Sequence, residues 1–152
     1  MQFDFTQLLD YLQSLGRRRA AIGRASLGYA GEGLYPIVVV EPDPLCAEST
    51  AGLLTYDVAL LVLDRERDAT GEYRPDPGQV PGLLARTGQW CDELVEMLHH
   101  EHPGDVVKGS YSRVAIPAGV GGDLATGWRV ELRLQVRQYL NRNTNAALFT
   151  AE

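Results

Sequence analysis

The chain is poor in cysteine and has no long apolar run. Its two cysteines, Cys46 and Cys91, form no CxxC pair, so we expect reduced, packed thiols rather than a disulfide or a reactive site. No stretch approaches the roughly 18 apolar residues that a membrane span needs. The basic cluster near the N-terminus follows the apolar stretch, the reverse of a secretory signal. We therefore expect a soluble, cytosolic protein without membrane contact.

The chain also lacks an excess of positive charge. Its formal net charge is −6, which argues against attraction of the whole molecule to nucleic acid. Apolar residues make up 45% and charged residues 22% of the 152 positions. This is an ordinary globular composition, and a chain of this length can bury a sufficient core without a disulfide or a metal. One domain is expected over residues 1–140, followed by a tail at 141–152.

Two helices are predicted from the spacing of apolar residues. The first follows Asp4, which forms a capping box with Gln7, and Gly16 is expected to end it. The second is expected to start near Pro81, a residue that suits the first turn of a helix, and to end near His100. Each helix has one apolar face that must pack against another layer.

Four strands are predicted, at 34–41, 53–64, 106–116 and 127–139. The first two are rich in β-branched and aliphatic residues, which is typical of strands covered on both faces. Residues 17–33 are interpreted as an irregular connection. The order is then α-β-β-α-β-β, which favours an α+β fold. We expect a mainly antiparallel sheet of four strands, or slightly more, with both helices packed on one face.

The fourth predicted strand alternates strictly between apolar and polar residues. Its apolar row is expected to face the helices. The polar row faces either water or a neighbouring subunit, because Glu131 interrupts the arginines and the acidic chain disfavours a row that reads DNA. The apolar row is Trp128, Val130, Leu132, Leu134 and Val136, and the polar row is Arg129, Glu131, Arg133, Gln135 and Arg137.

Further arginines lie in two polar segments. One is the cluster at 17–19, and the other is the charged segment 65–80, which is long for a connection and therefore a candidate contact region. A surface between subunits, or one lining a lumen, is predicted from the charged strand and these segments together. Its candidate residues are Arg17, Arg18, Arg19, Arg65, Arg67, Arg74, Arg129, Glu131, Arg133 and Arg137.

No motif assembles a catalytic centre. The run HHEH at 99–102 could offer His99 and His102 to zinc, with Glu96 or Cys91 as a further ligand, but it matches no zinc motif. A polar helix end explains these histidines better. The glycine-rich run at 118–123 has no phosphate-binding lysine after it. We expect neither a cofactor nor a metal, and no enzymatic activity.

Three stretches carry a resemblance to a known family: YPIVVVEP, TYDVALLVLDRE and TGWRVELRLQV. Together with the element order, they resemble tail terminator and tail completion proteins of long-tailed bacteriophages. The likeness covers about residues 4–140 and consists of topology and strand character, with no diagnostic motif.

The resemblance implies a structural protein of the virion, assembled in the cytoplasm of the bacterial host. Such proteins form a homo-oligomeric ring, often a hexamer, that caps the tail tube and joins it to the head or neck. Their partners are the tail tube protein and neck or connector proteins, and DNA passes without sequence-specific binding. The segments 65–80 and 117–127 would then be contact arms. Two alternatives stay open: a small metal-dependent enzyme using the histidines at 99–102, and a monomeric or dimeric protein-binding module of the same fold class.

Overall fold

The computed structural model describes residues 3–28, 34–42, 47–50, 52–65, 77–116, 125–137 and 146–149. Two α-helices, α1 (Phe5–Arg18) and α2 (Val80–Glu101), are joined by strands and by a short 3-10 helix, η1 (Pro77–Gln79). The strands are β1 (Ala25–Leu27), β2 (Ile37–Val40), β3 (Ala47–Thr50), β4 (Leu53–Asp64), β5 (Ser112–Ile116) and β6 (Thr126–Arg137).

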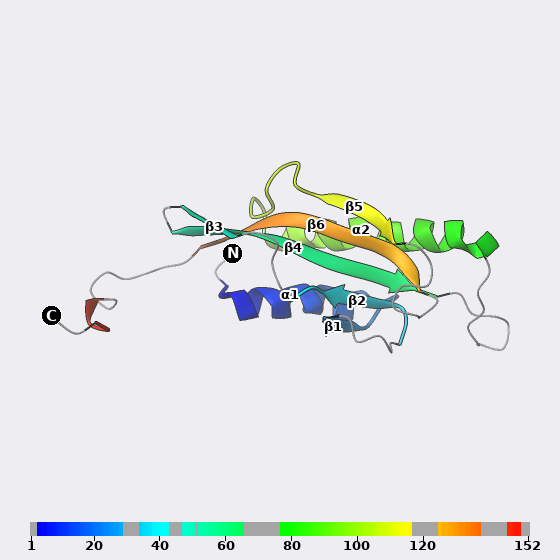
Figure 1. Ribbon diagram of the computed structural model, residues 1–152, viewed down its shortest axis with the longest axis horizontal. Coiled ribbons are helices and arrows are strands. Elements are labelled where there is room, and N and C mark those ends of the chain that lie inside the picture. Colours follow the sequence, from blue (N-terminus) through cyan, green and yellow to red (C-terminus); the bar gives the residue numbers. More distant parts are fainter. Residues whose placement is uncertain are drawn as a thin grey trace.

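The strands form one mixed sheet (Figure 1). Five of them lie in the order β1-β2-β4-β6-β5, and β3 pairs with the first residues of β4. The pairing of β1 with β2 is parallel, and every other pairing is antiparallel. The α+β class and the mainly antiparallel character are therefore confirmed, whereas the number of strands rises from the predicted four to six.

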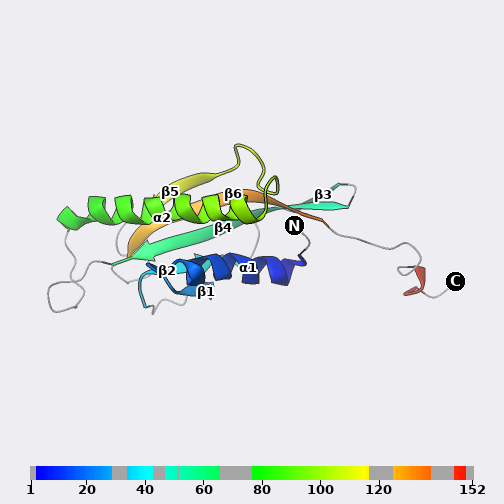
Figure 2. The same ribbon diagram turned by 180° about the vertical axis from the view of Figure 1, so that it is seen from behind.

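Both helices cover the same face of the sheet (Figure 2). Their apolar residues meet the inward rows of β2, β4 and β6 in one core cluster. On β6 this row is the predicted one, because Val130, Leu132, Leu134 and Val136 are all buried, while Trp128 packs at the margin of the cluster. The two-residue alternation of the strand thus places its apolar side chains against the helices.

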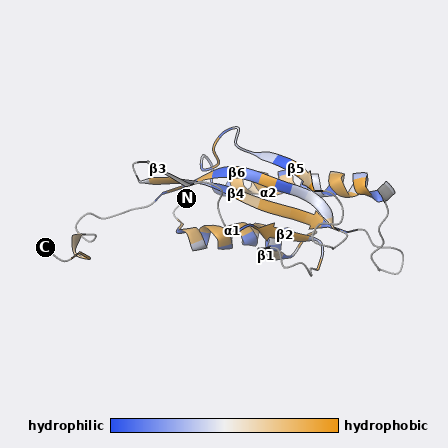
Figure 3. Cartoon of the chain, viewed as in Figure 1, coloured by the Kyte–Doolittle hydropathy of each residue, from blue (hydrophilic) through white to orange (hydrophobic). Residues whose placement is uncertain are grey.

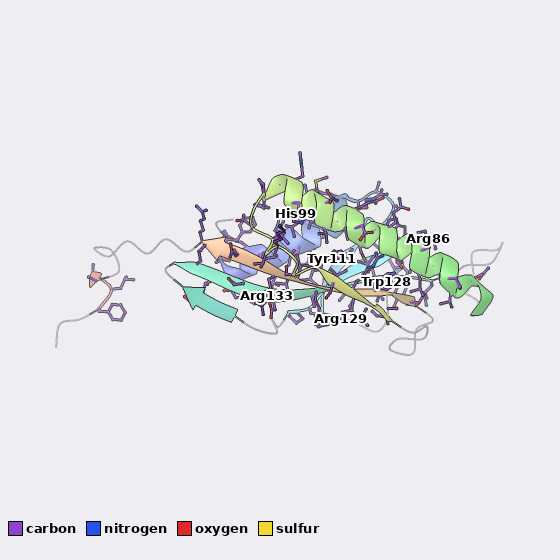
Figure 4. The ribbon with its side chains drawn as sticks, turned by 90° about the horizontal axis from the view of Figure 1, so that it is seen from above. Arg86, His99, Tyr111, Trp128, Arg129 and Arg133 are labelled. Carbon is purple, nitrogen blue, oxygen red and sulfur yellow. The ribbon has the colours of Figure 1, made fainter. Side chains whose placement is uncertain are left out.

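Polar contacts hold α2 in place over the sheet. The indole Nε1 of Trp128 donates to the backbone oxygen of Leu84 at 2.8 Å. Arg86 pairs with the buried Asp64 of β4 at 2.7 Å. On β5, the guanidinium of Arg113 lies over the Trp128 ring, 4.7 Å from its centroid. Arg113 also donates through Nη1 to the backbone oxygen of Gly88 in α2 at 2.5 Å. These contacts link α2 to β4, β5 and β6 on one face of the sheet (Figure 4).

We call the side of the sheet opposite the helices the outer face. One part of it is apolar, where Tyr35, Val39, Leu63 and Ala125 form a second, small buried cluster. The other part is charged, and hydrophilic residues interrupt β6 along its length (Figure 3). No helix of the described ranges lies on this face.

The predicted end of the first helix was wrong. The capping box between Asp4 and Gln7 is present, but α1 continues past Gly16 to Arg18 and is capped at Arg19. Gly16 is buried, and a Cβ atom there would lie 2.7 Å from Cβ of Val38. The glycine therefore permits α1 to approach β2 closely, and it does not terminate the helix.

The predicted strands also need correction. The segment 17–33 is not wholly irregular, since β1 pairs with β2, between Gly23 and Gly28 with positive φ angles of 68° and 77°. A hairpin adds β3 to β4 across Gly52, whose φ is 83°. The third predicted strand shortens to β5, because Gly109 (φ 76°) and a turn interrupt the extended backbone. The bounds of β4 are those predicted.

Candidate functional site: the charged outer face

The pairing register of β4 and β6 gathers charged side chains on the outer face. Across the pair, Arg133 stands opposite Asp57, Glu131 opposite Ala59 and Arg129 opposite Leu61. Cross-strand neighbours point to the same side of a sheet. Figure 4 accordingly shows Arg129 and Arg133 on the side of the sheet away from α2.

Arg129 lies at the centre of this group. Its Nε and Nη2 atoms donate to the two carboxylate oxygens of Glu41 at 2.9 and 2.8 Å. Its Nη1 atom donates to Glu131 on the same strand. A guanidinium matches a carboxylate well in this two-bond arrangement. The bonds to Glu41 raise the pKa of Arg129, so its charged form is stabilised.

Arg133 forms a second pair on the same face. Its Nε donates to Oδ1 of Asp57 at 2.7 Å, and its backbone N–H donates to the hydroxyl of Ser110 at 3.1 Å. Beside this pair lies an open depression of about 410 Å³, whose lining includes Lys108 and Glu131. We call Glu41, Asp57, Arg129, Glu131 and Arg133 the charged outer face.

These pairs decide between two interpretations of the arginine row. Arg129 and Arg133 each have a carboxylate partner on their own subunit, so two of the three positive charges of the row are largely compensated locally. A row that binds the phosphates of DNA needs cations that are not neutralised in this way. The geometry therefore favours water or another protein surface as the neighbour of this face.

The sequence patterns did not identify Glu41 and Asp57 as members of the group. Asp57 carried a usable signal, since it is a charged residue inside a strand interpreted as buried on both faces. Glu41 follows the last residue of β2, and its position beside Arg129 depends on how β2 and β4 pair. That register cannot be read from either strand alone.

The arginines at 17–19 lie in the helical layer, apart from the charged outer face. Arg18 binds Glu101 of α2 through two hydrogen bonds of 2.9 and 2.6 Å, and Arg19 binds Glu93 at 2.6 Å. Arg17 bonds to Gln13 of its own helix. These contacts tie the end of α1 to α2, so the structure does not bring the two predicted groups of arginines together.

The bonds between the helices shift the acidity of the carboxyl groups. Hydrogen bonds from Arg18, and then from Tyr11, lower the pKa of Glu101 from 4.5 to about 2. Hydrogen bonds from Arg19 and then Gln89 lower the pKa of Glu93. Both carboxylates are therefore held in the charged form, as a structural link between helices requires.

The other predicted surface residues are scattered. Arg65 follows β4, and its guanidinium lies over the Tyr35 ring, 4.4 Å from the centroid. Arg137 ends β6 opposite Leu53 and is exposed. Arg67 and Arg74 lie outside the described residues. A role of these side chains in an interface or a lumen stays a prediction.

The histidine run ends α2, as a polar helix end would. The ring of His102 packs against Tyr11 and Phe3, with centroids 4.7 and 5.5 Å apart, and His99 is exposed. Within the described ranges, no group of three or more His, Cys, Asp and Glu residues could hold a metal ion. Cys91 is buried, and this burial raises the pKa of its thiol to about 12.

Two comparisons with known proteins found no relative of this chain. No protein-family model matches the chain. A search of curated proteins finds no match either. Among the described residues, neither helix combines the length and the apolar character that a membrane crossing requires.

Proposed function

We propose that the protein is a structural subunit of a phage or prophage-derived tail, which assembles with copies of itself into a ring. The ring caps or completes the tail tube and joins it to the head or neck. The observation that carries this proposal is the long β4–β6 ribbon, in which two strands of twelve residues pair over their whole length. Its charged outer face is not covered by a helix of the described residues.

The charge pattern of this face supports contact between identical copies. Acids and arginines lie side by side on β4, on β6 and at Glu41 after β2, so the face offers both signs of charge within a few residues. A surface with both signs can pair acid with arginine when a second copy approaches. Arginine is also the charged residue that protein interfaces tolerate best.

The ring would have a structural role and would catalyse no reaction. Its partners are the tail tube protein on one side and neck or connector proteins on the other, and DNA would pass through its lumen. The net charge of −6 is compatible with that passage, since an acidic protein does not attract a phosphate backbone. In this proposal the protein resides in the virion and is assembled in the cytoplasm of the host.

Light scattering on the purified protein, combined with negative-stain imaging, tests the proposal. We expect a measured mass several times that of one subunit, in a whole-number ratio, and closed rings in the images. Arg133→Ala should reduce the ring fraction while leaving the subunit folded. Arg113→Ala is the control, because it removes an ion pair on the helical side without leaving a buried carboxylate unpaired. A strict monomer at high concentration, alone and with tube protein, would refute the ring.

A further inference from the structure

The helical layer carries an apolar groove on its surface. It has a volume of about 290 Å³ and is lined by Leu15, Leu94 and Met97, with Arg18, Arg19 and Glu93 at its rim. Leu15 and Leu94 are buried at its floor, whereas Met97 is 45% exposed. We call this hollow the interhelical groove. All of its lining residues belong to α1, α2 or the helix cap at Arg19, so it opens away from the sheet.

Ion pairs link the two helices at the rim of the groove. Arg19 of the α1 cap pairs with Glu93 of α2, and Arg18 pairs with Glu101 at the end of α2. A preformed apolar hollow with a few polar groups at its edge is the usual form of a binding site. An apolar cavity of about 150 Å³ already accommodates benzene. The interhelical groove therefore has room for an aromatic ring and a neighbouring aliphatic side chain.

Two neighbouring apolar residues near the C-terminus, Leu148 and Phe149, lie outside the hydrophobic core. Leu148 and Phe149 are 77% and 74% exposed, and neither contributes to the two core clusters. They lie in a single turn closed by a bond from the N–H of Phe149 to the oxygen of Ala146. Figure 1 shows residues 146–149, in red, apart from both helices.

We propose that residues 146–149 of one copy dock into the interhelical groove of a second copy, with Phe149 and Leu148 against Leu15, Leu94 and Met97. Methionine adapts its shape to an incoming side chain. Glu152 is the one charged residue of the segment 143–152, and its negative sign suits the arginines at the rim. The inference rests on the proposed function, since it names a contact that links copies within the ring.

Geometry favours a second copy over the chain's own groove. Beneath the groove, Leu15 and Leu94 pack at the level of Leu60, Val130 and Leu132. From there to Arg137, β6 runs five to seven residue steps, or about 17–23 Å at the rise of a strand. The nine residue steps from Arg137 to residue 146 span about 30–32 Å at most. Folding back to the far side of the helical layer would use most of that length.

Mixing two variants that each carry one added cysteine tests the docking. Both variants carry Cys46→Ser, one with Met97→Cys and the other with Ala147→Cys, which lies in the same turn and keeps Leu148 and Phe149. Cys91 is buried with a raised pKa and stays out of the exchange. After mild oxidation, we expect disulfides between positions 97 and 147 of different copies, seen by mass spectrometry. Val114→Cys is the control for Met97→Cys, since Val114 is 65% exposed on another surface of the molecule.

Two results would overturn the docking. One is a yield of the 97–147 link no higher than that of the 114–147 link. The other is a link within one chain of the double variant with none between chains. Phe149→Asp should weaken self-association about tenfold or more, and Leu27→Asp, at another exposed leucine, should not. Rings that persist with Phe149→Asp would refute the docking and leave the ring standing. An open dimer in place of a ring would refute the ring, whereas the cross-link between two copies would still support the docking. A strictly monomeric wild-type protein would refute both.

Discussion

Replacing Gly16 by alanine probes the closest approach between helix and sheet. A Cβ atom at this position would lie 2.7 Å from Cβ and 2.8 Å from Cγ2 of Val38, and 3.3 Å from the backbone oxygen of Arg24. The first two distances are shorter than carbon atoms normally reach. Either α1 or β2 must therefore move, and Val38 is fully buried.

The magnitude follows from two opposing effects. Alanine stabilises a helix interior by about 0.5–1 kcal/mol relative to glycine. An extra methyl group in a packed core costs about 1–3 kcal/mol. Val38 is β-branched and buried, so its rotamer cannot adjust, and the cost should lie in the upper half of that range. We expect Gly16→Ala to lower the free energy of unfolding by about 1–2.5 kcal/mol.

Gly82→Ala is the matched control. Gly82 lies in the first turn of α2, and a Cβ atom there would have nothing within 4 Å. The same substitution should leave the protein as stable or raise its stability by up to about 1 kcal/mol. Urea unfolding of both variants measures the difference, provided that the m-value is unchanged. A Gly16→Ala protein as stable as the wild type would refute the close approach of α1 to β2.

Three further predictions concern the core, the acid dependence and the thiol. Leu132→Ala should cost about 2–5 kcal/mol as a core truncation, whereas Arg133→Ala should cost less than about 1 kcal/mol in the isolated subunit, both measured by urea unfolding. Because the pKa of Glu101 falls from 4.5 to about 2 on folding, its stabilisation is complete above pH 4.5 and is lost as the pH falls toward 2. Glu101→Gln should therefore flatten this part of the stability profile, measured by unfolding at a series of pH values. In a Cys46→Ser background, Cys91 should resist a thiol reagent when folded and react when unfolded, since its pKa is raised to about 12; a rapid reaction of the folded protein would contradict its burial.

Local patterns predicted the elements whose signal repeats over many residues. The alternation in β6 identified both its buried row and its charged row, because a strand turns successive side chains to opposite faces. The long aliphatic run predicted the bounds of β4. The capping box at Asp4 located the start of α1, since both partners lie within one turn of the helix. In each case the information is local to the element.

The missing parts depend on distant residues. The strands β1 and β3 have three and four residues, too few for a periodic signal, and their partners β2 and β4 stabilise them. Gly16 resembles a helix terminator until Val38 of β2 is known to lie against it. The partners of the arginines at 18 and 19 come from α2, more than seventy residues away. Packing between layers decides these features.

The ion pairs of the charged outer face constrain how a second copy can bind there. A neighbour that covered Arg129 and Glu41 without replacing their hydration would bury a charged pair, and the desolvation cost can exceed the attraction within the pair. Assembly through this face therefore needs polar groups of the neighbour beside each pair. The same face supplies such groups, since it carries acidic and basic side chains on the paired strands β4 and β6. Self-association there is favoured when each copy offers its carboxylates to the arginines of the next.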